Sequence, residues 1–143
     1  MMVMHYLGSI TGVPSITSIV LLLDLVLERA GRPLLFTTER RVLLWIVAVT
    51  SLVLYPSALG FTSLDVYRFG FSPAAPLGIA FLGIAAAVRR EIRLALLTLV
   101  ILLSLDLRLL PSVNAFDYAI DPIVGLLAIL WASVRMMTII THA

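Results

Sequence analysis

The sequence predicts an all-α membrane protein: a polytopic bundle of five transmembrane helices, with its N-terminus outside and its C-terminus in the cytoplasm. The chain is 62% hydrophobic and 13% charged, with a mean hydropathy of +1.13, beyond the range typical of water-soluble domains. Its charges fall in four short clusters, and the apolar stretches between them approach the roughly 20 residues that a helix needs to cross a bilayer. Arginine is concentrated in alternate connections between these stretches.

Five apolar stretches define the expected helices, at 6–27, 42–59, 74–88, 92–110 and 122–140. Glycine and proline at Gly31, Pro33 and Pro111 are typical of helix ends, and Pro122 suits a first helical turn. The 143 residues leave room for one bundle, so the sequence predicts a single transmembrane domain, 1–143.

The arginines predict the orientation. Two connections are rich in arginine: Arg29, Arg32, Arg40 and Arg41 in the first, and Arg89, Arg90 and Arg93 in the second. The connections expected on the opposite face carry one arginine each, Arg68 and Arg108. Positive loops stay on the cytoplasmic side. All ten basic residues are arginine, a bias typical of GC-rich bacterial coding, so we expect a multi-pass protein of the bacterial inner membrane.

An internal repeat is a further hypothesis. Arg41 precedes Asp65 by 24 residues, and Arg93 precedes Asp117 by the same distance. These spacings favour a tandem helical hairpin, 41–89 and 93–135, with the copies related by an axis along the membrane normal. The alternative is that any two hairpins with arginine inside and aspartate outside look alike.

Charged side chains near the outer face form the main candidate site, because charge is costly in a membrane and calls for a partner or a role. The candidate residues for an outer pocket or docking site are Asp65, Tyr67, Arg68, Asp106, Arg108, Asp117, Tyr118 and Asp121. One interpretation is a lattice of ion pairs, Asp106 with Arg68 and Arg108 with Asp65, Asp117 or Asp121. The other is an acidic and aromatic pocket.

Asp24 is the candidate intramembrane ionisable residue. It lies four residues before Glu28, so both share one helix face. We expect them to meet arginines of the neighbouring inner turns; the alternative is that Asp24 carries protons.

Two other segments indicate contact surfaces. Small residues in 74–88, such as Gly78 and Gly83, would let another backbone approach closely, either within the chain or from a partner subunit. The aromatic segment 65–73 is expected to fold back on the bundle as a short turn.

Composition argues against several kinds of chemistry. The chain has no cysteine and only two histidines, at opposite ends, so no catalytic residue, cofactor or metal is expected. The net charge of +2 does not suggest a nucleic-acid partner.

Three function classes follow. The first is an accessory or scaffold subunit of a larger inner-membrane complex, which binds the lipid bilayer and either a partner subunit or further copies of itself. The second is a small transporter or channel for a polar or lipid-linked solute. The third, which the sequence favours least, is an intramembrane enzyme with a carboxylate site at Asp106, Asp117 and Asp121, because no nucleophile accompanies them.

Overall fold

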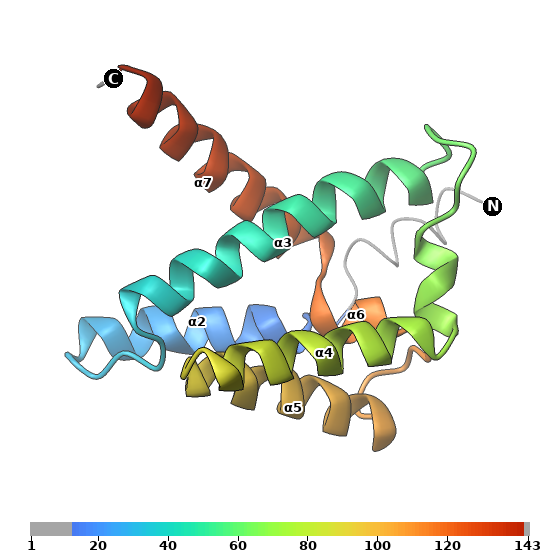
Figure 1. Ribbon diagram of the computed structural model, residues 1–143, viewed down its shortest axis with the longest axis horizontal. Coiled ribbons are helices and arrows are strands. Elements are labelled where there is room, and N and C mark those ends of the chain that lie inside the picture. The colour runs from blue at the N-terminus through green and yellow to red at the C-terminus, as the bar shows by residue number, and fades with distance from the viewer. Residues whose placement is uncertain (1–12, 142–143) are drawn as a thin grey trace.

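A computed structural model describes residues 13–141, which fold into helices without a strand (Figure 1). The elements are α2 (Ile16–Arg29), α3 (Thr37–Ala58), η1 (Tyr67–Phe71), α4 (Ala74–Val88), α5 (Ile92–Asp106), α6 (Ala115–Ala119) and α7 (Pro122–Thr141). The all-α prediction is therefore confirmed for this part of the chain. The first seven residues of the predicted helix 6–27 lie outside the described residues.

The prediction of five membrane spans is not supported, because three of the helices are too short. Only α3, with 22 residues, and α7, with 20, have the length and apolar composition of a span. Helices α2, α4 and α5 have 14, 15 and 15 residues. At about 1.5 Å per residue they reach about 21–23 Å, less than the roughly 30 Å apolar thickness of a bilayer.

The end of α5 shows why apolar composition overestimates helix length. The sequence predicts a helix to Leu110, but α5 ends at Asp106. Arg108 adopts a left-handed backbone with φ of 52°, and the backbone N–H of Leu109 donates to the Ser104 carbonyl at 3.0 Å. This is the hydrogen bonding of a helix C-terminus, and the apolar residues Leu107, Leu109 and Leu110 continue beyond it.

The connections contain two short helices that the sequence does not predict. The 3-10 helix η1 lies in the aromatic segment, and α6 precedes α7. The segment 65–73 does fold back on the bundle as expected, since η1 contacts α3, α4 and α6.

The helices pack mainly as two pairs. Helix α3 packs against α7, and α4 packs against α5, while α2 lies beside α5 (Figure 1). Helix α7 crosses α3 with the edge of Trp131 against Trp45, at 5.7 Å between ring centroids. Beyond this crossing, α7 diverges from the other helices (Figure 1).

Small residues allow the close contacts within both pairs. A methyl group at Gly83 would lie 2.2 Å from the Thr98 hydroxyl oxygen of α5, and one at Gly125 would lie 2.6 Å from that of Ser51 in α3. The small residues of α4 therefore contact a helix of the same chain, one of the two expected alternatives. Gly78 faces open space. The hairpin repeat stays a prediction.

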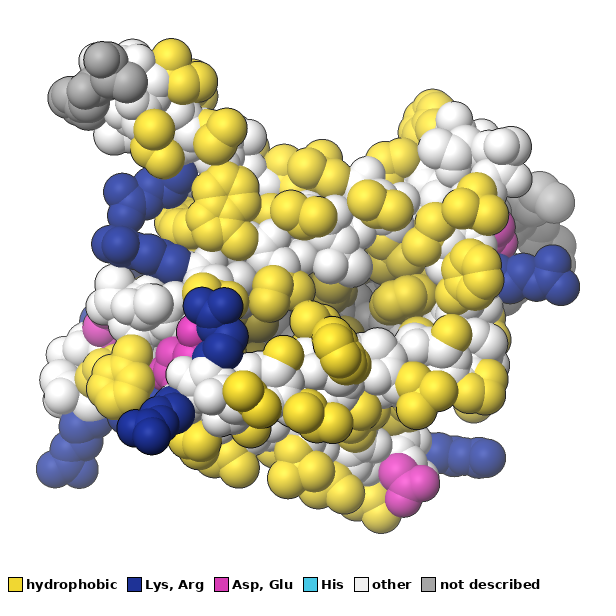
Figure 2. Space-filling view, viewed as in Figure 1, with side chains coloured by type: hydrophobic (Ala, Val, Ile, Leu, Met, Phe, Trp, Pro, Cys, Tyr) yellow, Lys and Arg dark blue, Asp and Glu magenta, His cyan; other side chains and the backbone are white. Residues whose placement is uncertain are grey.

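Apolar side chains are spread over the face of the molecule shown in Figure 2. Only 33% of the apolar window of α3, and 22% of that of α7, is buried, whereas the core helices of a soluble protein are mostly buried. The cationic side chains gather mainly at the end where α2 closes and α3 begins (Figure 2). Two long, exposed apolar helices support membrane association.

We call the end formed by the α2–α3 and α4–α5 turns the arginine end. The opposite end, formed by η1, α6 and the beginning of α7, is the loop end.

Candidate functional site

Asp24 is a structural acid at the arginine end. Its side chain is 1% exposed, and its two oxygens accept hydrogen bonds from the Leu35 backbone N–H, at 2.9 Å, and from Nε of Arg40, at 2.6 Å. A buried carboxylate requires such partners. The predicted pairing of Asp24 with an arginine of the inner turns is confirmed.

Arg40 joins a second acid to this cluster. One terminal nitrogen of its guanidinium lies 2.7 Å from Oε2 of Glu28, which is largely exposed. Because Asp24 and Glu28 lie on one face of α2, a single arginine from α3 contacts both. The cluster closes the α2–α3 hairpin.

Glu39 is a site residue that the sequence analysis missed. Its Oε2 accepts from the backbone N–H of Phe36 at 3.0 Å, and its Oε1 accepts from that of Arg93 at 3.3 Å. It therefore joins the first turn of α3 to that of α5. A glutamate three residues after the residue that precedes a helix is a recognised capping signal, and it could have indicated the first contact.

At the loop end, Tyr67 and Asp117, two of the candidate site residues, form a hydrogen bond that the sequence analysis did not specify. The Tyr67 hydroxyl donates to Oδ1 of Asp117 at 2.7 Å, and the Ser112 hydroxyl donates to the other oxygen. Burial, together with the nearby Asp117 carboxylate, raises the pKa of Tyr67. Tyr67 therefore acts as a neutral donor that joins η1 to α6.

Tyr118 and Asn114 lie in the interior, away from any open site. The Tyr118 hydroxyl donates toward the Leu110 and Ser112 carbonyls, each at 3.0 Å, and accepts from the Leu110 N–H. Asn114, which the sequence analysis did not select, donates to the Tyr67 carbonyl at 3.1 Å and caps α6. Its position leaves no room for a side chain at Gly70.

Asp121 caps α7 and joins it to α2. Oδ1 accepts from the backbone N–H groups of Ile123 and Val124, both at 3.0 Å, and Oδ2 accepts from the Ser15 N–H at 2.9 Å and from the Ser18 hydroxyl. Burial opposes ionisation of Asp121, but these hydrogen bonds outweigh it and lower its pKa. Asp121 is thus an ionised structural residue.

The predicted lattice of outer ion pairs is wrong. Within residues 13–141, ion pairs join Arg40 to Asp24 and Glu28, and Arg89 to Glu91; none involves Arg68, Arg108 or Asp106. Asp65 instead accepts from the Arg68 backbone N–H at 3.2 Å. For Asp65, Asp117 and Asp121 the reason is that backbone N–H and hydroxyl groups lie nearer than any guanidinium does, and they satisfy these carboxylates.

Two of the predicted site residues remain beside an open space. Asp106 and Arg108 line a recess of about 370 Å³ at the loop end, near the lower limit for small-molecule pockets. The rest of its lining is Gly70, Phe71, Ser72, Pro73, Pro76, Leu105 and Val113. The recess has room for a small molecule with a cationic group that faces Asp106 and an anionic group that faces Arg108.

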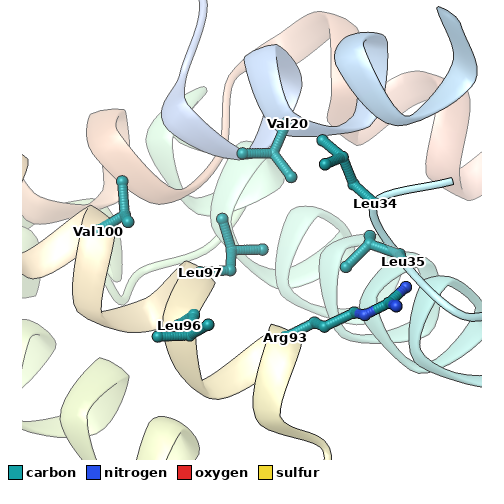
Figure 3. Close-up of a pocket in the computed structure, with 7 residues that line it drawn as sticks. All are labelled: Val20, Leu34, Leu35, Arg93, Leu96, Leu97 and Val100. Atoms are coloured by element: carbon teal, nitrogen blue, oxygen red, sulfur yellow. The ribbon is translucent and has the colours of Figure 1, made fainter. Parts of the chain in front are cut away.

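A second hollow lies nearer the arginine end, between α2 and α5. It has a volume of about 210 Å³, and Figure 3 shows its side chains. Its lining is apolar except for Arg93: Val20, Leu34, Leu35, Leu96, Leu97 and Val100 complete it. In residues 13–141, no group of acidic or histidine side chains is arranged to hold a metal ion.

A scan against models of known protein families, a search of curated proteins and a search of solved structures each found no match.

Proposed function

We propose that this protein is an accessory subunit of a larger assembly in a bacterial inner membrane, and that α7 packs against a membrane helix of a partner. In this proposal α3 and α7 cross the membrane in opposite directions, and the shorter helices pack beside them. The arginine end faces the cytoplasm, as positively charged connections do.

One observation carries the proposal. The distal segment of α7, residues 133–141, extends beyond Ala132, the last buried residue of this helix. It continues for nine residues, or about 13 Å, without a buried position. Figures 1 and 2 show it apart from the other helices.

The surface of the distal segment suits a protein neighbour. Its exposed side chains include Met136, Met137, Ile139 and Ile140. Methionine adapts to irregular contacts and is frequent at binding surfaces. The hydroxyls of Ser133, Thr138 and Thr141 donate to carbonyls of their own helix, so a partner helix would not need to satisfy them.

The experiment is extraction of the full chain from native membranes in mild detergent, followed by native mass spectrometry. We expect a stoichiometric partner chain to remain bound. Met137→Trp should release it, because bulk on the distal segment prevents close packing. Val49→Trp is the matched control, since Val49 is also an exposed residue of a long helix. Recovery of the chain alone as a monomer would contradict the proposal.

The recess at Asp106 and Arg108 favours a second candidate, a small transporter for a polar or lipid-linked solute. Neither charge has an ion-pair partner in the described part of the chain, so both are free to bind a solute that carries complementary charges. Solute uptake into vesicles that is lost in Asp106→Asn would support it, and uptake unchanged by that variant would remove its basis.

The geometry gives less support to an enzyme. Of the three carboxylates considered for an outer site, Asp117 and Asp121 accept hydrogen bonds from several donors within the fold. Only Asp106 lines the recess.

A further inference from the structure

The apolar hollow between α2 and α5 has the form of a groove with one cation at its end. On α5, its lining residues Arg93, Leu96, Leu97 and Val100 are spaced by three or four residues and so share one helix face. Leu35 and Leu97 form a buried floor, and Leu96 and Val100 are 54% and 45% exposed. Figure 3 shows Val20 of α2 opposite this face.

Arg93 differs from Arg40 at the same end of the molecule. Arg40 contacts two carboxylates, whereas no ion pair in residues 13–141 involves Arg93. The Arg93 guanidinium carbon lies 3.7 Å from the centre of the Phe36 ring, and one terminal nitrogen donates to the Pro33 carbonyl at 3.4 Å. Stacking uses the face of the guanidinium plane and leaves N–H groups at its edge for an acceptor.

A positively charged edge above an apolar groove complements an anionic amphiphile. From Arg93 to Val100 the groove follows α5 for seven residues, or about 10 Å, which suits the first part of an extended acyl chain. A phosphate level with Arg93 would accept charge-assisted hydrogen bonds. A soluble anion would leave the apolar lining uncovered, so the groove favours a lipid.

We propose that this groove binds one acyl chain of an anionic phospholipid, with the lipid phosphate accepting hydrogen bonds from Arg93. The inference rests on the membrane location within the proposed function. The lipid is anionic and lies in the leaflet at the arginine end. When bound, it stabilises the contact between α2 and α5.

The test is native mass spectrometry of the full chain in detergent, titrated with phosphatidylglycerol, with phosphatidylcholine and with inorganic phosphate. We expect phosphatidylglycerol to bind about tenfold more tightly than phosphatidylcholine. Arg93→Gln should remove this preference, and Arg41→Gln, which alters an exposed arginine outside the groove lining, should preserve it. Val100→Phe should weaken binding of both lipids by filling the groove, whereas Val49→Phe should not.

Several outcomes would overturn the inference. Equal binding of the two lipids would show that charge has no role, and an unchanged preference in Arg93→Gln would exclude Arg93. Competition by inorganic phosphate that is insensitive to Val100→Phe would identify a soluble anion as the ligand. Circular dichroism of each variant shows whether the helices are retained.

The outcome is separable from that of the proposed function. Lipid binding is measured on the isolated chain, and partner binding is measured on native extracts. A chain that keeps a stoichiometric partner in native extracts but shows no lipid preference contradicts this inference alone. A chain that prefers phosphatidylglycerol but is extracted alone as a monomer contradicts the proposed accessory role alone.

Discussion

At the arginine end, one guanidinium joins two helices through oppositely charged side chains, with Arg40 at 2.6 Å from Asp24 and 2.7 Å from Glu28. At the loop end, the aspartates accept hydrogen bonds from hydroxyl and backbone groups instead, as Asp117 does from Tyr67 and Asp121 from Ser15. Both ends contain acids and arginines, but among residues 13–141 ion pairs form only at the arginine end.

Charge composition therefore does not determine whether a carboxylate is satisfied by an arginine or by hydrogen bonds. At the arginine end, α2 and α3 are joined by a short turn, so Asp24 and Arg40 are brought together whenever the hairpin closes. At the loop end, Arg68 and Arg108 are exposed, while serines, a tyrosine and helix N-termini lie beside the acids. Because those acids accept hydrogen bonds from these groups, Arg68 and Arg108 stay in contact with solvent or headgroups.

The largest expected effect is at Asp24. Asp24→Asn removes the buried charge that pairs with Arg40 and turns an amide nitrogen toward either Arg40 Nε or the Leu35 N–H, and breaking a buried pair costs about 3 kcal/mol. We expect a loss of about 3 kcal/mol in the free energy of unfolding, measured by denaturant titration in mixed micelles. A loss below about 1 kcal/mol would contradict the structural role of this pair. It would favour the alternative that Asp24 carries protons.

Gly70 tests the packing of the loop end. An alanine methyl group there would lie 1.8 Å from Oδ1 of Asn114, so η1 or Asn114 must move. Overpacking of this kind costs about 1–3 kcal/mol, and we expect Gly70→Ala to lose about 2 kcal/mol in the same titration.

Gly78→Ala is the matched control for Gly70→Ala. Gly78 lies in α4 with nothing within 4 Å of an added methyl group, and alanine is a better helix former by about 1 kcal/mol. This variant should be slightly stabilised. Equal losses in the two variants would show that Asn114 does not approach Gly70 closely.

The contrast between Gly70, which is closely packed, and Gly78, which faces open space, illustrates what the sequence could and could not predict. Five apolar stretches predict where the five main helices lie, and the i, i+4 spacing of Asp24 and Glu28 predicts that both acids share one helix face and meet arginines of the inner turns. The sequence does not predict that Asn114 contacts Gly70, which lies far from it along the chain, because such contacts depend on how η1 and α6 meet. The end of α5 at Asp106 was missed for a similar reason, since arginine rarely adopts the left-handed backbone seen at Arg108.

The lowered pKa of Asp121 predicts how the free energy of unfolding depends on pH. The pKa of Asp121 is lower in the folded protein than in the unfolded chain, where an aspartate titrates at about 3.9. The ionised form therefore stabilises the fold above about pH 4, and this contribution is lost as the pH falls through the folded pKa. We expect Asp121→Asn to cost about 1 kcal/mol at pH 7, and to cost less at pH 3. A cost that does not change between these pH values would show that Asp121 acts without its charge.

The smallest expected effect is a difference between the two ends in how salt changes the free energy lost on mutation. Glu28 is 46% exposed, and exposed ion pairs contribute only about 0–1 kcal/mol. We therefore expect Glu28→Gln to cost about 0.5 kcal/mol at low salt, and the cost should disappear at about 1 M salt, where the screening length is roughly 3 Å. Tyr67→Phe is the comparison at the loop end: it removes the hydrogen bond to Asp117, and its cost should persist at high salt because its donor is neutral. If both costs responded equally to salt, the distinction between a charged arginine end and a hydrogen-bonded loop end would be wrong.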